Sequence, residues 1–223
     1  MSVNFHKKEL GVGVFTASDI AGILKQPWRK VDRYLREYGD VRFGKRLFNE
    51  TYSWEVQGIR VVNFYALIEI AVFFRLRDKY HLSISKINKA RESMAEALST
   101  PYPFASNRVL ADTKHIWYDR LGDLVNADKT HQLNFKEIVE PLLDKIEFEG
   151  DVASRFFPLG KKVDVVVDPH HQFGQPIVKN TNIRVETLGR MKAGGESRRN
   201  LCWLYDLSAK QVNDALRYYK QAA

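Results

Sequence analysis

The chain has 223 residues, of which 35 are Lys or Arg and 27 are Asp or Glu, giving a formal net charge of +8 at pH 7. With 44% hydrophobic residues it can bury a core, which excludes a wholly disordered chain. The single cysteine, Cys202, excludes an internal disulfide and a cysteine-based zinc site. The first residues lack a signal peptide's apolar segment, and the longest apolar run, residues 61–74, is too short to cross a bilayer. We therefore expect a soluble, cytoplasmic protein without a membrane partner.

Positive charge is concentrated in the two end segments of the chain. The net charge is +6 over residues 1–99, −3 over residues 100–160 and +5 over residues 161–223. Clustered cations attract polyanions, so the ends are candidates for contact with nucleic acid. The prolines of the Thr100-Pro101-Tyr102-Pro103 run mark a boundary, because they stop a helix. We predict an N-terminal domain over 1–99, a connector over 100–160 and a helical domain over 161–223.

The first predicted elements are two short helices joined by a tight turn. Residues 15–24 are predicted to be helical, with Thr16 and Asp19 spaced as in a capping box. Pro27 suits the first turn of a second helix, over residues 28–38. Two helices joined by a short turn, with a basic second member, have the outline of a helix-turn-helix.

A predicted wing and two longer helices complete the N-terminal domain. Residues 41–48 and 53–62 are rich in β-branched and aromatic side chains and are predicted as the two strands of the wing. Asn63 is a candidate N-cap for an apolar helix over 64–77, and a further helix is predicted over 83–98.

The rest of the chain is predicted to be mainly helical with small β elements. The connector is expected to hold a hairpin (109–111 with 115–118) and a helix over 135–146, and a β-rich run over 163–167 is predicted at the start of the last domain. The last domain is expected to contain three helices, over residues 185–193, 196–205 and 209–221. Gly194-Gly195 ends the first of these helices and Ser208 caps the third, which makes this domain a second helix-turn-helix candidate.

Cations on the second helix and on the wing predict a DNA-binding surface. Such side chains align with phosphates, and arginine can also reach guanine edges. We expect the wing cations to meet phosphates and Arg29 and Arg33 to meet bases; the alternative is an ordinary solvated helix face. The predicted DNA-binding residues are Arg29, Lys30, Arg33, Arg36, Arg42, Lys45 and Arg46.

The C-terminal domain offers a second candidate surface, for DNA, for a partner protein or for its own copy. Its members are Arg198, Arg199, Lys210, Gln211, Asn213 and Arg217. The adjacent Trp203, Leu204 and Tyr205 are predicted to be core, with a protein-binding patch as the alternative. The acidic residues within 137–151 are predicted to be a solvated helix and loop, with a toxin-facing surface as the alternative.

Two segments resemble known families. Residues 15–38, the predicted wing and residues 63–91 resemble a MerR-type winged helix-turn-helix. Residues 167–183, which read VDPHHQFGQPIVKNTNI, resemble the DUF433 family, which usually has Gly at the place of Asn180. Asn is the next-best residue for a left-handed backbone, so we expect a tight turn there. The combination resembles a VapB-type antitoxin, which implies silencing of a PIN-domain ribonuclease toxin and repression of the shared promoter by binding double-stranded DNA.

The sequence predicts no enzymatic activity, no catalytic residue, no metal and no cofactor. His170 and His171 are adjacent, which makes them poor joint metal ligands, and the Gly11-Val12-Gly13 run lacks the rest of a phosphate-binding loop. A homodimer is expected, because helix-turn-helix repressors usually occupy two half-sites. Two alternatives stay open: a MerR-like regulator with no toxin, and a protein-interaction module whose DNA binding is secondary.

Overall fold

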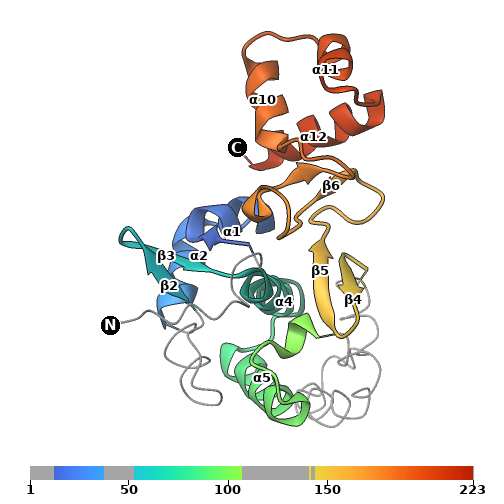
Figure 1. Cartoon of the computed structure of the whole chain (residues 1–223). Helices are drawn as coiled ribbons and strands as arrows, with labels where there is room; N and C mark the ends of the chain where they lie inside the picture. Colours follow the sequence, from blue (N-terminus) through green and yellow to red (C-terminus); the bar gives the residue numbers. More distant parts are fainter. Residues whose placement is uncertain (1–12, 38–52, 107–140, 142–143, 223) are drawn as a thin grey trace, which may run out of the picture. The chain divides into compact units, whose positions relative to one another are not determined.

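The computed structural model describes residues 13–37, 53–106, 141 and 144–222, and these form two compact units. Of the described residues, unit 1 combines 13–32, 55–64 and 155–222, and unit 2 combines 33–37, 53–54, 65–106, 141 and 144–154. The described residues are mainly helical, with small antiparallel sheets, as the sequence predicts (Figure 1).

The N-terminal end of unit 1 begins with a short strand and a capped helix. Helix α1 (Ala17–Leu24) has the predicted capping box: Asp19 N–H donates to Thr16 Oγ1 (3.1 Å), and Thr16 N–H donates to Asp19 Oδ2 (2.8 Å). The prediction that the helix includes Phe15 was wrong, since Phe15 and Thr16 form strand β1. Lys25 is the C-cap that follows α1, and its φ of 55° is left-handed.

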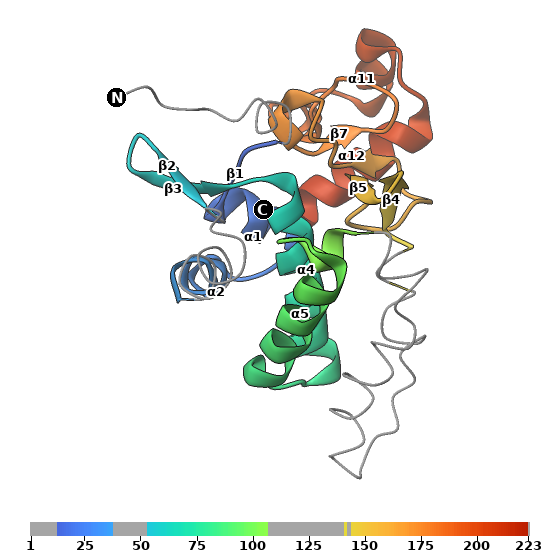
Figure 2. The same cartoon turned by 60° about the horizontal axis from the view of Figure 1, so that its bottom comes forward.

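Strand β1 belongs to a three-stranded sheet with the order β1-β3-β2 (Figure 2). β2 (Trp54–Val56) and β3 (Ile59–Val62) form a hairpin around Gln57 and Gly58, whose φ values are 50° and 76°. The prediction of one strand over residues 53–62 was therefore wrong. Two consecutive residues with positive φ are typical of the two-residue turns that suit the strand twist. The other predicted wing strand, over 41–48, lies outside the described residues.

Helix α2 (Trp28–Tyr34) follows α1 after three residues, and a π turn over residues 35–37 continues it. Its inner face carries Val31, Tyr34 and Leu35, whose exposure is 4% or less. In unit 2 the ring of Tyr34 lies 4.2 Å from that of Phe73, centroid to centroid.

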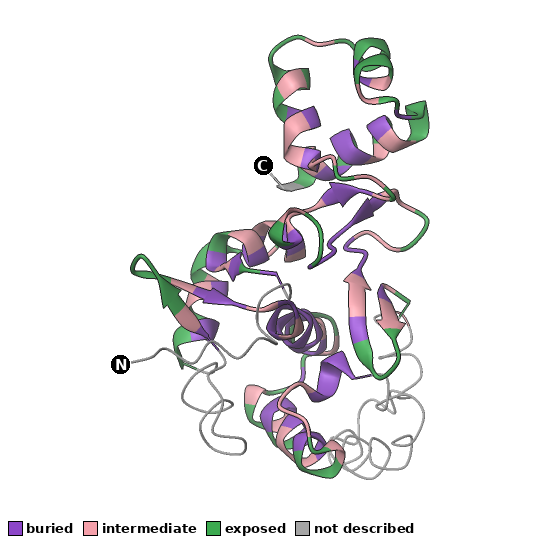
Figure 3. Ribbon diagram, in the orientation of Figure 1, coloured by how far each residue is buried: buried purple, intermediate pink, exposed green. Residues whose placement is uncertain are grey.

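Unit 2 is organised around a helix that is buried on nearly all sides. Helix α4 (Phe64–Tyr80) extends three residues beyond its predicted end, and its residues 66–74 are all buried (Figure 3). Helix α5 (Ile84–Leu98) follows and begins one residue later than predicted, because Ser83 is its N-cap and its hydroxyl accepts a hydrogen bond from Lys86 N–H. The first helix was predicted from its apolar run and the second from apolar side chains on one face, and both helices are confirmed.

A buried ion pair joins α4, α5 and the segment after them. Arg91 Nε lies 2.6 Å from Glu69 Oε2, and Arg91 Nη2 donates to the Pro101 carbonyl. Phe104 N–H donates to Glu69 Oε1 at the start of the 3₁₀ helix η2 (Pro103–Ala105). Burial raises the pKa of Glu69 overall, although Arg91 and the backbone amides of residues 104 and 105 act in the opposite direction. The pair therefore fixes the turn that the two prolines were predicted to make.

The connector differs from its prediction at its end. Residue 146, predicted to be helical, begins strand β4 (Ile146–Glu149), which pairs with β5 (Val152–Phe156). Gly150, with a φ of 60°, lies in the turn between them. The acidic residues 147, 149 and 151, predicted to belong to a solvated helix and loop, lie in this hairpin. The predicted hairpin over 109–118 lies outside the described residues.

The C-terminal part of unit 1 packs three helices on a two-stranded sheet. β6 (Val165–Val166) pairs antiparallel with β7 (Ile177–Val178), and α10 (Val185–Ala193), α11 (Arg198–Tyr205) and α12 (Ala209–Ala222) follow. α10 matches its predicted span, while α11 begins two residues later, after its N-cap Ser197. Apolar side chains from all three helices and the sheet form one core, which includes Val165, Val178, Val185, Leu188, Leu201, Leu207, Val212, Ala215, Leu216 and Tyr218.

The N-terminal strand is docked on the C-terminal part of unit 1. Phe15 is fully buried, and a Cβ atom on Gly174 would lie only 2.3 Å from its ring. Gly174 has a φ of 86°, which is a further reason for glycine at this position. Val14 N–H donates to the Phe173 carbonyl (3.1 Å), and Gln175 Nε2 donates to Asp19 Oδ1 (3.0 Å). Residues about 160 positions apart in sequence thus share one core.

The contact between α10 and α12 requires a glycine, which gives a first prediction. A Cβ atom on Gly189 would lie 2.2 Å from the Tyr219 ring, whereas one on Gly22 in α1 would meet nothing within 4 Å. We expect Gly189→Ala to lower the free energy of unfolding by about 1–3 kcal/mol through overpacking. The matched control Gly22→Ala should raise it by about 0.5–1 kcal/mol. Urea unfolding followed by circular dichroism measures both, and equal effects would contradict the predicted contact.

The buried pair of unit 2 gives a second prediction. Glu69→Ala would leave the Arg91 guanidinium buried without its carboxylate, which typically costs about 3–5 kcal/mol. Glu96, exposed on α5, is the control, and Glu96→Ala should change the free energy of unfolding by less than about 0.5 kcal/mol. Thermal unfolding of both variants tests this, and a Glu69→Ala protein as stable as Glu96→Ala would refute the role of the pair.

Candidate nucleic-acid and partner surfaces

The predicted DNA-binding side chains of α2 lie on its outer surface. Arg29, Arg33 and Arg36 are exposed, and Lys30 is half-buried, with its Nζ 3.0 Å from Gln26 Oε1. Because Arg29 and Arg33 are four residues apart, they lie on one face of the helix, opposite the buried Val31, Tyr34 and Leu35 side. The remaining predicted residues, Arg42, Lys45 and Arg46, lie outside the described residues.

The predicted C-terminal surface divides into two parts, and the first is an ion-pair network. Lys210 Nζ lies 2.5 Å from Asp164 Oδ2 and 2.9 Å from Asp214 Oδ2, and Arg217 Nη2 lies 3.1 Å from Asp214 Oδ1. Hydrogen bonds to the two carboxylates raise the pKa of Lys210. Burial raises the pKa of Asp214, but its contacts with Lys210 and Arg217 outweigh burial and lower the pKa overall. Two of the six predicted residues are therefore balanced by acidic neighbours.

Gln211 and Asn213 differ in their surroundings. Gln211 Oε1 accepts from the backbone N–H of Ser208 (3.0 Å), and Gln211 N–H donates to Ser208 Oγ (3.2 Å). This reciprocal arrangement is a capping box, so the start of α12 is fixed by local hydrogen bonds. Asn213 is exposed on the same helix.

The second part of this surface is α11, which exposes large apolar side chains. The prediction that Trp203 and Leu204 are core was wrong, because their side chains are 85% and 53% exposed. Leu201 is the buried residue of this helix, and it packs into the core of the three helices. Arg199 is exposed one turn before Trp203, so a cation and an indole are neighbours on the outer face. A large apolar pair beside arginine is typical of protein interaction surfaces.

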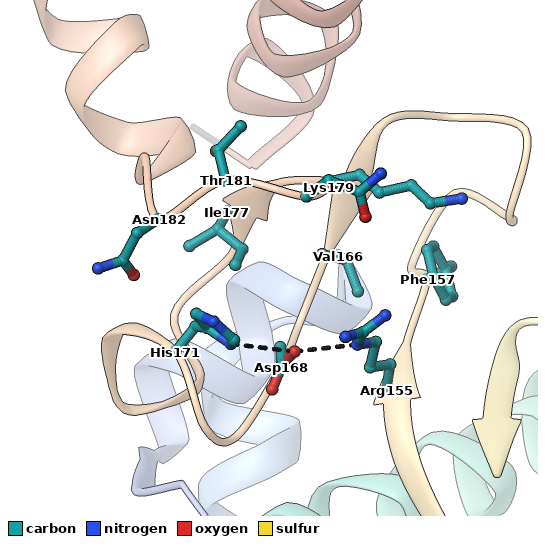
Figure 4. A pocket seen from close by; sticks show the side chains of 10 residues that line it. Arg155, Phe157, Val166, Asp168, His171, Ile177, Lys179, Thr181 and Asn182 are labelled. Atoms are coloured by element: carbon teal, nitrogen blue, oxygen red, sulfur yellow. Dashed lines mark hydrogen bonds and ion pairs between the residues drawn. The ribbon is translucent and has the colours of Figure 1, made fainter. Parts of the chain in front are cut away.

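A pocket of about 360 Å³ lies in unit 1 beside the segment that resembles DUF433 (Figure 4). Asp168 is at its centre: its Oδ2 atom lies 3.0 Å from Arg155 Nε and 3.1 Å from His171 Nδ1. Its Oδ1 atom accepts a hydrogen bond from His170 N–H (2.9 Å). The Asp168 side chain is 6% exposed, whereas those of Arg155 and His171 are 42% and 46% exposed.

The opposite wall of the pocket is the turn that follows β7. Asn180 has a φ of 62°, in agreement with the left-handed turn expected at this position. Thr181 Oγ1 donates to the Val178 carbonyl (2.8 Å) and accepts from Ile183 N–H (3.1 Å), which fixes the turn. Lys179 and Asn182 line the pocket from this side.

Sequence reasoning missed this pocket for an identifiable reason. Asp168 and His171 were considered only as part of a family motif and as poor metal ligands. Arg155 lies 13 residues earlier, in strand β5, and Lys179 lies 11 residues after Asp168, so no short-range spacing indicates the cluster. The antiparallel pairing of β6 with β7 and the bridge between Phe156 and Val167 bring these residues together.

Within residues 13–37, 53–106, 141 and 144–222, no group of three or more His, Cys, Asp or Glu side chains is placed to hold a metal ion. Among the helices in the same ranges, none is long and apolar enough to cross a membrane.

Comparison with known proteins gives one family match and distant relatives. Residues 165–219 match the family described as "Protein of unknown function (DUF433)". The chain is 25% identical over 167 residues to "Uncharacterized protein Rv2308" of Mycobacterium tuberculosis, covering 69% of each chain. It is 34% identical over 91 residues to "Putative antitoxin VapB45" of the same organism, covering 40% of this chain and 38% of that protein.

A solved structure has the same fold. The crystal structure of Rv2018 from Mycobacterium tuberculosis matches 91% of this chain and 96% of its own, with a TM-score of 0.72 and 21% sequence identity. The family match covers β6, β7, α10, α11 and α12 up to residue 219, which agrees with the resemblance seen in residues 167–183.

Proposed function

We propose that the chain is the antitoxin of a type II toxin–antitoxin pair, which neutralises a PIN-domain ribonuclease and represses its own promoter. The observation that carries this proposal is the partial identity to the VapB45 protein, supported by the DUF433 match over residues 165–219. In this role the chain has no catalytic residue, cofactor or metal of its own, and it acts by binding in the cytoplasm.

The DNA-binding part of the proposal assigns a winged helix-turn-helix to the N-terminal elements. α1 ends at Leu24 and α2 begins at Trp28, and a turn of three to four residues is typical of a helix-turn-helix. α2 serves as the recognition helix, with Arg29 and Arg33 directed to base edges. The hairpin β2–β3 serves as part of the wing, and a homodimer presents two such units to two half-sites.

The partner-binding part of the proposal assigns the toxin to the outer face of α11. Trp and Arg are the residues that most often dominate the binding energy of protein interfaces. Trp203 and Arg199 are both exposed on that face, and their helix is anchored through Leu201, so the surface is held in place before binding. In this assignment Lys210 and Arg217 serve the domain's own stability through Asp164 and Asp214.

Charge reversal on α2 tests the DNA-binding role. We expect Arg29→Glu with Arg33→Glu to weaken promoter binding by about a hundredfold or more and to flatten its salt dependence, because two phosphate or base contacts are lost. The matched control is Lys161→Glu with Lys162→Glu, which changes the net charge equally at exposed positions away from α2. Electrophoretic mobility shifts at several salt concentrations measure both. Equal losses in the two double variants would contradict a specific role for α2.

Truncation of the exposed indole tests the partner surface. We expect Trp203→Ala to weaken the complex with the product of the neighbouring toxin gene by about 2–4 kcal/mol, since a central Trp typically contributes that much. Promoter binding and thermal stability should not change, because the indole is 85% exposed. The control Ile59→Ala removes another exposed apolar side chain, on β3.

Binding measurements with the toxin also distinguish the proposed antitoxin from a regulator that has no toxin. Titration calorimetry with the co-expressed toxin gives the affinities, and a Trp203→Ala protein that binds like the wild type would place the toxin elsewhere. Failure of the neighbouring gene product to co-purify with the wild-type chain would instead favour the regulator.

A further inference from the structure

We propose that the pocket between Asp168 and the turn over residues 179–182 binds the phosphate group of a small organic ligand. No lining residue of this pocket belongs to α2 or α11, so the site is separate from those two surfaces. Phosphate binding there is therefore independent of whether the chain is an antitoxin.

The lining of the pocket presents hydrogen-bond donors and one fully engaged acceptor group. Both oxygens of Asp168 already accept hydrogen bonds or ion pairs, from Arg155 and His171 on Oδ2 and from the His170 amide on Oδ1. No other carboxylate is among the lining residues. A cation would have to compete with Arg155 and His171 for Asp168, whereas an oxyanion would meet arginine, lysine, histidine and amide donors.

Asp168 acts as a support for the two side chains beside it. Asp168 is 6% exposed, whereas Arg155 and His171, which contact it from two sides, are each close to half exposed (Figure 4). Because the carboxylate contacts His171 through Nδ1, the Nε2 atom of the ring is turned away from it. Nε2 has no hydrogen-bond partner among the residues that the structure describes. Groups held in this way lose little conformational freedom when a ligand binds.

Lys179 and Asn182 line the pocket at the two ends of the turn after β7, with the Lys179 side chain directed toward Phe157 (Figure 4). Lys179 Nζ lies 5.4 Å from the centroid of the Phe157 ring and, within the described part of the chain, makes no hydrogen bond or ion pair. The Asn182 side-chain amide is likewise unbonded there, since only the backbone carbonyl of this residue is used, by Gln172 Nε2. Lysine binds phosphate as a point charge, so it does not need the planar fit that arginine requires.

The charge and the size of the pocket indicate a phosphate attached to an organic group. The lining carries two permanent cations, Arg155 and Lys179, against one carboxylate, and a phosphate monoester brings about −1.5 to −2 charges at pH 7. A volume of about 360 Å³ lies in the range of small-molecule sites, which start near 300 Å³. Val166, Ile177 and Phe157 also line the pocket but are 3% exposed or less, so the polar groups carry the recognition. We use adenosine 5′-monophosphate as the probe because it joins a phosphate monoester to an organic group.

The experiment titrates the full chain with adenosine 5′-monophosphate, adenosine and inorganic phosphate, without toxin or promoter. We expect saturable binding of the monophosphate with a Kd of about 1 mM or tighter, and binding of adenosine at least about tenfold weaker. Inorganic phosphate should compete for the same place, since it carries the shared group. Isothermal calorimetry gives the affinities, and the NMR shifts of the imidazole protons of His171 locate the ligand.

Matched variants connect the binding to the pocket. Lys179→Ala should weaken monophosphate binding by about tenfold while leaving the fold intact, because the ammonium group bonds to no described residue. Asn182→Asp, at an exposed position, should weaken it further by adding a negative charge. Lys161→Ala, which removes an exposed lysine outside the pocket, should leave the affinity unchanged.

Several results would overturn the inference. They are equal affinity for adenosine and its monophosphate, equal loss in Lys179→Ala and Lys161→Ala, and absence of saturation by the monophosphate at about ten times the expected Kd. Phosphate binding that appears only with duplex DNA would assign the pocket to a nucleic acid and would also refute a small ligand. Because no toxin or promoter is present, failure here leaves the antitoxin proposal standing, and the reverse also holds.

Discussion

The packing of Phe15 against Gly174 is the contact on which the organisation of unit 1 depends. A side chain at residue 174 would collide with the ring, and the positive φ there independently favours glycine. The adjacent hydrogen bonds from Val14 and Gln175 continue the same contact on both sides. Asp19 has two functions in it, since one carboxylate oxygen completes the cap of α1 and the other accepts the Gln175 amide. The start of the DNA-binding candidate is thereby joined to the segment that resembles DUF433.

Local signals predicted most of the helices, and long-range pairings account for most of the errors. Thr16 with Asp19, Ser83 and Ser208 cap helices through side chains that contact residues three positions away, so sequence spacing is sufficient to find them. Strand β1 is only two residues long and exists because it pairs with Val61 and Val62, some 45 residues away. The Gln57-Gly58 turn had a local signal in its glycine, but glutamine is not a usual first residue of such turns.

In the candidate sites, too, local features could be predicted from the sequence and long-range contacts could not. Outward cations on α2 follow from helical periodicity, because the apolar positions 31, 34 and 35 fix the inner face. Trp203 could not be assigned from its hydrophobicity, since exposure depends on how the neighbouring helices pack, and only Leu201 of α11 is fully buried by them. The pairing of Lys210 and Arg217 with Asp164 and Asp214 combines a helix with a loop nearly 50 residues earlier. The phosphate pocket likewise combines a strand, a loop and a turn.

The discontinuous make-up of unit 1 has a consequence for synthesis on the ribosome. Residues 13–32 emerge first, but Gly174, which their strand packs against, is translated some 160 codons later. At about 5–20 residues per second the nascent N-terminal segment waits for seconds before its docking surface exists. During that interval Phe15 has to be shielded by Phe64 and other earlier residues, or by a chaperone. A chain truncated before Gly174 would therefore keep strand β1 without the residues that it packs against.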